Sequence, residues 1–486
     1  MRAKNLLIVM SDQHSRGALG CYGHPEVRTP NLDRLAAQGT RFSSCWTTSP
    51  VCIPARASFA TGKYIHQIGF WDNADPYDGS IPSWHHRLRD AGHRVVSIGK
   101  LHFRGDDDDC GFSESIVPMH VVEGKGYLLG LIRDDLPVRG AAYKMAGMAG
   151  PGESPYTQYD REIAARAQIW LREEAHKHTD KPWVLFVSFV APHYPLTAPP
   201  EHYYRYFDDP KLPMPLFYSP EERPDHPFVR DYANAFNFDD YFETQDDVRR
   251  AVSGYLGLCS FMDEQTGKVL DALASAGLAA DTRVVYVSDH GDAVGKRGLW
   301  GKSTLYEETV GVPLILAGEG VPQGNVTETV ANLIDIYPFI IDCVGESGAG
   351  MIDRDHPGIS IARLACGERP ERTVLSEYHG MGSTTGAFAI RHGQFKYVHY
   401  VKYQPQLFDL ERDPDEAHDL SADRRYGEIV KQCEAKLRAL LSPEEVDARA
   451  KKRQAEQLEK HGGRAAVMAR GDLGFSPPPG IRPDFQ

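Results

Sequence analysis

The sequence lacks any run of about 18 consecutive apolar residues, the length that a membrane-spanning helix requires. Its first residues are basic at Arg2 and Lys4, but the apolar stretch that follows stops at Ser11 and Asp12. This pattern predicts a first β-strand rather than a secretion signal. Internal repeats are also absent. We therefore expect a protein that does not associate with a membrane.

Closely spaced cysteines and a surplus of basic residues are missing as well. None of the eight cysteines forms a C-x-x-C pair, which excludes a disulfide scaffold and a zinc module and favours a reducing, cytoplasmic setting. Lys and Arg number 54 against 67 Asp and Glu, a net charge of −13. This balance argues against nucleic acid as a partner. It still permits a small anionic substrate, which needs only a few local cations.

What the sequence does contain is an alternation of apolar runs and helical patterns. Short apolar runs that end in polar clusters occur at residues 6–10, 95–98, 183–190 and 283–287. Helical patterns lie between them, at residues 31–38, 161–176 and 245–276. The alternation predicts an α/β fold with a large, mostly parallel sheet covered by helices on both faces. Ligands of such sheets bind at the carboxyl ends of the strands, where the polar clusters stand.

The character of the chain changes near residue 370. Short strand patterns and a charged helix at 426–441 predict a smaller α+β domain with a short antiparallel sheet, so we divide the chain into a catalytic domain, 1–370, and a C-terminal domain, 371–486. The tail from residue 475 holds four prolines and two phenylalanines and cannot form a core. It is either a disordered end or an arm that docks on a neighbouring subunit. Segments 104–155 and 197–245 are expected to be surface insertions that select the substrate.

The most informative stretch is Cys52-Ile53-Pro54-Ala55-Arg56, which is followed by Thr61-Gly62. Pro54 suits the first position of a helix, where its missing N–H is harmless. A cysteine at a helix start feels the positive end of the helix dipole and is expected to ionise easily. The same helix start, with an arginine nearby, predicts an anion-binding site.

Oxygen-bearing residues end two of the predicted strands. Asp12-Gln13 follows the first strand, and Asp289-His290 lies in a Ser-Asp-His-Gly-Asp run after the last. Two carboxylates at the same edge of a sheet suit a divalent cation. The glycine that follows His290 lets the backbone turn close to such a site.

Taken together, the C-x-P-x-R motif with its T-G and the two metal-type pairs resemble type I sulfatases, a branch of the alkaline phosphatase superfamily. The resemblance implies that a formylglycine-generating enzyme oxidises Cys52 to formylglycine, whose hydrated aldehyde attacks sulfur on one divalent metal ion. The implied metal ligands are Asp12, Gln13, Asp289, His290 and residue 52. Oxygen ligands favour Ca²⁺, while the imidazole also suits Mn²⁺. Many sulfatases have Asp and Asn at the positions of Gln13 and His290. The Gln and His found here are similar to the residues of choline sulfatases and phosphonate monoester hydrolases at these positions.

The resemblance also assigns roles around this centre. Lys100 and His102 alternate at a strand end and therefore point the same way. Lys100 is expected on the sulfate or leaving oxygen, and His102 on the second hydroxyl of the nucleophile. The implied catalytic set is Cys52, Arg56, Lys100, His102, His193 and Lys302. The implied substrate contacts are Asn73, Lys100, His193 and Lys302.

Three functions are compatible with this set. The leading one is hydrolysis of sulfate monoesters to an alcohol and inorganic sulfate. The second is hydrolysis of phosphonate monoesters or phosphodiesters by the same nucleophile, since these substrates present a similar monoanionic centre. The pair of Lys100 and His102 favours a sulfate ester over these phosphorus-containing substrates. The third is a catalytically silent anion-binding protein, if Cys52 is never oxidised. We also expect a homo-oligomer that forms through the C-terminal tail.

Overall fold

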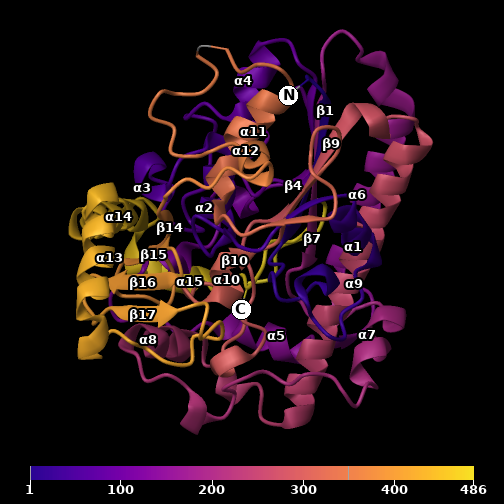
Figure 1. The fold of residues 1–486 in the computed structure, drawn as a ribbon. Coiled ribbons are helices and arrows are strands. Elements are labelled where there is room, and N and C mark those ends of the chain that lie inside the picture. The colour runs from indigo at the N-terminus through magenta and orange to yellow at the C-terminus, as the bar shows by residue number, and fades with distance from the viewer. Residues whose placement is uncertain (1, 349, 486) are drawn as a thin grey trace.

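A large central sheet organises the molecule in the computed structural model, which describes residues 2–348 and 350–485 (Figure 1). Its eight strands lie in the order β12-β2-β11-β9-β1-β7-β4-β5. The bounds are β1 (Asn5–Asp12), β2 (Gly39–Phe42), β4 (Val95–Lys100), β5 (Glu114–Met119), β7 (Val184–Pro192), β9 (Thr282–Ser288), β11 (Leu314–Ala317) and β12 (Asn325–Thr327). β11 is antiparallel to both neighbours, and all other neighbouring pairs of this sheet are parallel. The predicted mostly parallel sheet is confirmed.

Strand β1 shows why both faces of the sheet are covered. Leu6, Ile8 and Met10 belong to one hydrophobic core and Leu7 and Val9 to another, because side chains alternate along a strand. All five are fully buried. Helices packed in the core of Leu7 and Val9 are α1 (Pro30–Ala37), α6 (Pro155–Ile169) and α9 (Gln245–Ser275). The core that contains Leu6, Ile8 and Met10, on the opposite face, includes residues of α2 (Cys52–Thr61), α4 (Trp84–Asp90), α11 (Ile336–Cys343) and α12 (Ile361–Ala365).

Helix α6 begins earlier than the pattern at 161–176 predicted. The Ser154 side chain accepts a hydrogen bond from the Thr157 N–H, and Pro155 occupies the first helical position. Both features favour a helix start. The predicted pattern started only at Arg161 and left out this first part of the helix, where Tyr156 and Tyr159 are buried in the core.

The C-terminal part has the smaller α+β architecture that we predicted. Strands β14 (Val374–Tyr378), β15 (Ala387–His392), β16 (Phe395–Tyr400) and β17 (Gln406–Asp409) form an antiparallel sheet in this order. Helices α13 (Gly427–Leu440), α14 (Pro443–Lys460) and α15 (Gly463–Arg470) follow. In Figure 1, α13 and α14 lie at one side, whereas the C-terminal end is in the middle of the view. The boundary at residue 370 stays a prediction.

Short elements complete the fold. The two segments that we expected to be insertions carry α5 (Tyr143–Gly147), β6 (Gly150–Pro151), β8 (Thr197–Ala198), α7 (Pro200–Phe207) and α8 (Pro227–Phe236). Segment 104–155 is only partly an insertion, because it also contains β5, an edge strand of the central sheet. Elsewhere lie α3 (Ile65–Ile68), α10 (Glu307–Val310) and the strands β3 (Cys45–Trp46), β10 (Gly311–Val312) and β13 (Ala331–Asn332), which form a small second sheet.

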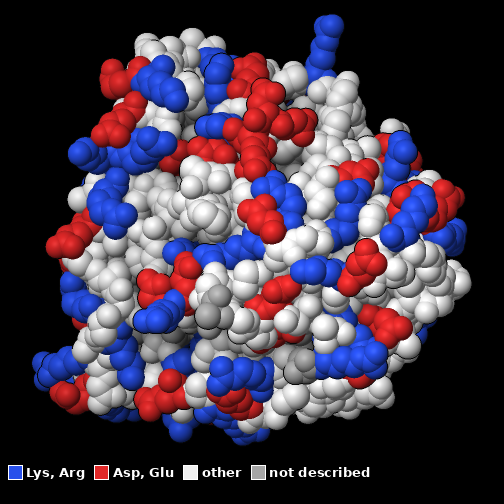
Figure 2. Space-filling view, turned by 90° about the horizontal axis from the view of Figure 1, so that it is seen from above, with Lys and Arg blue, Asp and Glu red and all other residues white. Residues whose placement is uncertain are grey.

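The distribution of surface charge and the polarity of the helices are those expected from the amino-acid composition. On the face shown in Figure 2, acidic and basic side chains are interspersed, and Lys and Arg form no broad field there. Among the described residues, no helix combines the length and the apolar character needed to cross a membrane.

Candidate active site and metal centre

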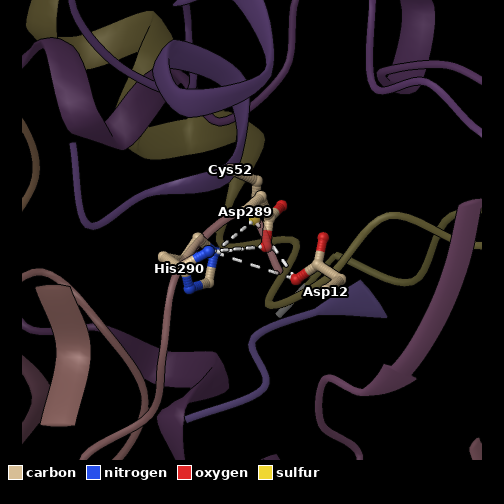
Figure 3. Close-up of side chains that lie close together, drawn as sticks. All are labelled: Asp12, Cys52, Asp289 and His290. Atoms are coloured by element: carbon tan, nitrogen blue, oxygen red, sulfur yellow. Dashed lines mark hydrogen bonds and ion pairs between the residues drawn. The ribbon is translucent and has the colours of Figure 1, made fainter. Parts of the chain in front are cut away.

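Four buried side chains converge at the carboxyl edge of the sheet: Asp12, Cys52, Asp289 and His290 (Figure 3). Their potential ligand atoms all lie within 4.8 Å of one another. The Cys52 Sγ is 3.1 Å from the His290 Nε2 and 3.7 Å from the Asp12 Oδ1. The register of the sheet causes this convergence, because Ser11 on β1 pairs with Ser288 on β9 and the next residue of each strand is an aspartate.

Cys52 stands at the first position of α2, with Val51 as the N-cap. The helix therefore begins two residues before the start that we predicted, and Pro54 lies within its first turn. The Asn73 Oδ1 accepts a hydrogen bond from the Ile53 N–H at 3.1 Å and so satisfies one free donor of the helix start. Asn73 also lines the pocket, but its oxygen is engaged here, so a direct substrate contact from it stays a prediction.

The thiol of Cys52 does not ionise easily in this setting, contrary to our expectation. Burial and the nearby Asp12 carboxylate raise its pKa to about 11, although Lys302 and Lys100 act in the opposite direction. The Lys302 Nζ donates a hydrogen bond to the Sγ at 2.7 Å. Desolvation outweighs the helix dipole here, since it penalises the charged form of a fully buried group.

His290 presents one defined nitrogen to the cluster. Its Nδ1 lies 2.9 Å from the carbonyl oxygen of Gly291, which can only accept a hydrogen bond. Nδ1 is therefore the donor, and Nε2 carries the lone pair that a metal ion needs. Burial lowers the pKa of His290, which favours this neutral form.

Gln13 supplies a further oxygen, and its surroundings test whether the site fits a metal ion. Its backbone lies in the left-handed region (φ 69°), and its N–H donates to the Asp289 Oδ1 at 3.1 Å. Its side-chain nitrogen donates to Asp292. Its Oε1 is buried and has no hydrogen-bond partner among the described residues. A buried acceptor without a partner is costly by ~1–3 kcal/mol, so two carboxylates, an imidazole and this free oxygen fit a divalent cation.

Arg56 holds the two carboxylates rather than an anion in the pocket. Its Nε donates to the Asp289 Oδ2 at 2.8 Å and one terminal nitrogen to the Asp12 Oδ2 at 3.2 Å. The other terminal nitrogen donates to the carbonyl of Lys100 and the hydroxyl of Ser188. The guanidinium is buried, so the part of our prediction that placed Arg56 at a substrate anion is replaced by this structural role.

Lys100 and His102 both reach the site, although not by strand alternation. β4 ends at Lys100, whose Nζ is 2.6 Å from the Asp12 Oδ2. His102 lies beyond the strand with φ 59°, a left-handed conformation that breaks the alternation we assumed. Its Nε2 is 2.9 Å from the Oγ of Ser476, a residue of the C-terminal tail. Burial and the charge of Lys100 hold the pKa of His102 well below its usual value.

His193 and Lys302 face residue 52 from the pocket. His193 follows β7, and its Nδ1 is 2.6 Å from the carbonyl of Tyr194, so Nδ1 is the donor and Nε2 remains for the pocket. Burial and the charge of Lys302 lower the pKa of His193 well below its usual value. Burial also acts to lower the pKa of Lys302, but the neighbouring Cys52 and Asp12 outweigh it and raise the pKa.

Several aromatic side chains also line the pocket. Its lining includes Tyr127, Tyr194, Tyr232, Phe236, Trp300 and Tyr378. Tyr127, Tyr232 and Phe236 come from the two segments that we expected to select the substrate. Tyr378, Met381 and Gly474 come from the C-terminal part, and we did not predict them, because no local pattern marks residues that only tertiary packing brings to the pocket.

Comparisons with known proteins give matches over most of the chain. The family model described as "Sulfatase" matches residues 4–346, and the model "N-sulphoglucosamine sulphohydrolase, C-terminal" matches residues 295–442. A choline-sulfatase of Rhizobium meliloti (strain 1021) is 33% identical over 87% of this chain and 83% of its own. Arylsulfatase K of Bos taurus is 28% identical over 94% and 85%. The crystal structure of a phosphonate monoester hydrolase of Agrobacterium radiobacter superposes with a TM-score of 0.69 at 22% identity, covering 90% of this chain and 95% of that one.

Proposed function

This chain belongs to the sulfatase family, and from that premise we propose that it hydrolyses sulfate monoesters to an alcohol and inorganic sulfate at residue 52. The observation that supports this proposal is the arrangement around the Sγ of Cys52. Two carboxylates and an imidazole lie close to it, and Lys302 contacts it at 2.7 Å. A nucleophile between a metal-type cluster and a cation suits attack on an anionic tetrahedral centre.

Two groups from outside the chain belong to the proposal. A formylglycine-generating enzyme would convert Cys52 to formylglycine, which supplies the nucleophilic hydroxyl and a second hydroxyl for release of sulfate. One divalent ion, held by Asp12, Gln13, Asp289, His290 and residue 52, would supply Lewis acidity. Ca²⁺ is favoured by the oxygen ligands, and Mn²⁺ is compatible with the imidazole.

The chain's own cations perform the remaining tasks. Lys302 and Lys100 offset the negative charge that builds up on the sulfate oxygens. Arg56 keeps the two carboxylates in place. Lys302 carries a proton and lies beside residue 52, so it is the group positioned to donate a proton to the departing alcohol, whereas His193 offers an unprotonated Nε2 to the pocket.

Phosphonate monoester or phosphodiester hydrolysis is the second candidate, and a direct comparison of substrates decides between the two. We expect a larger kcat/KM for p-nitrophenyl sulfate than for a p-nitrophenyl phosphonate monoester. The opposite order would overturn the sulfatase assignment in favour of the second function. Mass analysis of the tryptic peptide 42–56 tests the third function, that of a catalytically silent anion-binding protein. The active protein should contain formylglycine at position 52, and an intact thiol in fully active protein would contradict the proposed nucleophile.

A homo-oligomer and a reducing compartment remain part of the proposal. All eight cysteines are free, as a reducing compartment requires. The oligomer is to be tested by light scattering, because the C-terminal tail, to which we assigned it, contacts its own chain in this structure.

A further inference from the structure

The C-terminal tail returns from α15 to the active site of its own chain. We propose that residues 471–476 are a working part of this site: Ser476 positions His102, and the segment closes the pocket so that efficient turnover is limited to small sulfate esters. The substrate class rests on the proposed function, whereas the closure of the pocket can be tested without it.

The contact between Ser476 and His102 is the first support. The Ser476 Oγ lies 2.9 Å from the His102 Nε2, and the two residues are each 1% exposed. The other ring nitrogen of His102, Nδ1, is buried and has no hydrogen-bond partner among the described residues. Among the described residues, Ser476 is thus the only hydrogen-bond partner of this imidazole, and it sets the orientation of the ring.

Ser476 is itself held firmly. The Tyr156 hydroxyl donates to the Ser476 carbonyl oxygen, and the Tyr127 hydroxyl lies 3.4 Å from the Ser476 Oγ. The ring of the preceding residue, Phe475, packs edge-on against Tyr156 and Tyr194, with centroids 5.4 and 5.9 Å apart. A loose end of the chain has no such set of buried partners.

A buried ion pair anchors the start of the segment. The Nε and one terminal nitrogen of the Arg139 guanidinium donate to the two oxygens of the Asp472 carboxylate, and each side chain is only 5% exposed. The Ala141 N–H donates to the same carboxylate at 3.0 Å. Arg139 belongs to the segment 104–155, so the tail closes onto the insertion that lines the pocket. Opening the pair without solvating both charges is costly.

The segment also forms part of the wall of the pocket. Gly474 lines it, and its carbonyl accepts a hydrogen bond from the Tyr194 hydroxyl at 2.6 Å. Gly474 has φ 74°, and a Cβ there would lie 3.0 Å from the Cβ of Ala141. Close approach and backbone conformation both require glycine at this position.

The closed pocket is small. Its volume is about 40 Å³, room for about three waters at the ~10–15 Å³ that one water needs. Cys52 is 0% exposed behind it. A substrate therefore enters when the tail lifts. His102 regains its partner only when the tail closes again, so esters that are small enough to be enclosed are turned over best. A sulfated polymer keeps the tail open and leaves His102 without Ser476.

Activity measurements on matched variants test the positioning of His102. Ser476→Ala is expected to lower kcat for p-nitrophenyl sulfate about tenfold, the scale typical of a lost supporting partner, with KM changed less than about twofold. Ser476→Thr keeps the hydroxyl and should restore most of kcat. Ile481→Ala, at an exposed tail position, is the control and should match the unaltered protein. Unchanged kcat in Ser476→Ala, or no recovery in Ser476→Thr, would overturn this role.

Removal of residues 471–486 tests the closure with two substrates. The shortened chain should lose the preference for p-nitrophenyl sulfate over a sulfated tetrasaccharide, as a ratio of kcat/KM values, by about tenfold. An unchanged ratio would contradict the proposed selection by size. Circular dichroism and the melting temperature check that the chain folds. If it does not, the double variant Phe475→Ala with Ser476→Ala replaces it.

A third measurement does not depend on sulfatase activity. In protein made without the modifying enzyme, iodoacetamide should alkylate Cys52 at least about tenfold faster once the tail is removed, because the thiol becomes accessible. Cys45 lies on the same tryptic peptide, 42–56, and is a buried internal reference whose rate should not change. Equal rates of Cys52 alkylation with and without the tail would contradict the proposed closure of the pocket.

The same assay separates a tail that closes its own chain from one supplied by a second copy. Closure within one chain predicts a Cys52 alkylation rate that is independent of protein concentration. A rate that rises on dilution would overturn it in favour of exchange between subunits. If the unaltered, modified protein hydrolyses no sulfate ester while removal of the tail still exposes Cys52, the proposed function fails and the closure stands.

Discussion

Asp292 fixes the side chain of Gln13 so that its oxygen stays free. The Asp292 Oδ2 accepts a hydrogen bond from the Gln13 Nε2, and its Oδ1 accepts from the N–H groups of Val294 and Gly301 at 2.7 and 3.1 Å. With its nitrogen engaged, Gln13 retains a buried Oε1 without a partner among the described residues. A residue outside the ligand set thus decides which end of an amide is available to a cation.

Asp292→Asn is expected to weaken metal binding at least about tenfold. The new amide nitrogen cannot accept from Gln13 and favours a turned Gln13 amide, which presents N–H₂ in place of oxygen. Calorimetric titration with Ca²⁺ and with Mn²⁺, on protein that retains the Cys52 thiol, measures the change. Asp180→Asn, at an exposed loop position, is the control. Equal affinities in all three proteins would refute the role of Asp292.

Arg56→Met should destabilise the protein by ~3–5 kcal/mol, because it leaves the carboxylates of Asp12 and Asp289 buried without their shared cation. Urea unfolding measures the loss. Ca²⁺ should restore more stability to the variant than to the unaltered protein, since the ion replaces part of the missing charge. Arg34→Met, where the arginine is exposed, should change stability by less than ~0.5 kcal/mol. A small loss of stability in Arg56→Met that does not change when Ca²⁺ is added would contradict the role of Arg56.

His290→Asn is expected to change the selectivity of the site more than its ability to hold a cation. The substitution replaces a nitrogen ligand with an amide oxygen, which suits Ca²⁺ better than Mn²⁺. The ratio of Mn²⁺ to Ca²⁺ affinity should fall about tenfold, measured by competition between the two ions. His178→Asn, at a half-buried position outside the metal-type cluster, should leave this ratio unchanged. An unaltered ratio in His290→Asn would show that the imidazole does not ligate.

Glu377 gives a pH dependence of stability. Burial acts to raise its pKa, but His66, with Nδ1 at 2.8 Å, and His379, with Nε2 at 3.1 Å, outweigh it and lower the pKa from 4.5 to about 2. Because the folded-state pKa lies below the unfolded value, this carboxylate stabilises the fold fully above pH 4.5 and loses its effect as pH falls toward 2. The difference of about 2.5 pKa units corresponds to about 3 kcal/mol.

Glu377→Gln should therefore lower the free energy of unfolding at pH 7, with a deficit that shrinks steadily between pH 4.5 and pH 2. Urea unfolding at several pH values measures it. Glu371→Gln, at a side chain that is 83% exposed, serves as the reference and should show no such trend. A deficit for Glu377→Gln that is constant with pH would mean that the carboxylate charge is not the source.

Local sequence patterns predicted most of the fold and the residues of the candidate metal site. The apolar runs of β1 and β9 are bounded by polar residues, and parallel strands bring their carboxyl ends to one edge, so Asp12 and Asp289 had to meet once these strands were neighbours. The motif at Cys52 likewise placed a helix start there. That start lies two residues earlier than expected, where the Ile53 N–H donates to Asn73, a contact from outside the helix that the motif does not show.

Errors arose where burial or a single backbone angle decided the outcome. The helix start favoured an acidic thiol, but the desolvation of Cys52 exceeds that effect, and burial cannot be read from five residues. The positive φ of His102 ended the alternation on which we relied. Arg56 was expected to help bind an anion, because its carboxylate partners lie 44 and 233 positions away in the chain and no local pattern shows them.

The sequence by itself determined the chemistry of this protein: the cysteine motif, the two aspartates and the set of lysines and histidines are local patterns whose residue types limit what they can bind. The tertiary structure decided how that chemistry is enclosed. The contact of Ser476 with His102 joins residues 374 positions apart, and the ion pair of Arg139 with Asp472 joins residues 333 apart. Such contacts leave no periodicity in the sequence, because they exist only after the sheet, the insertion and the tail have packed together.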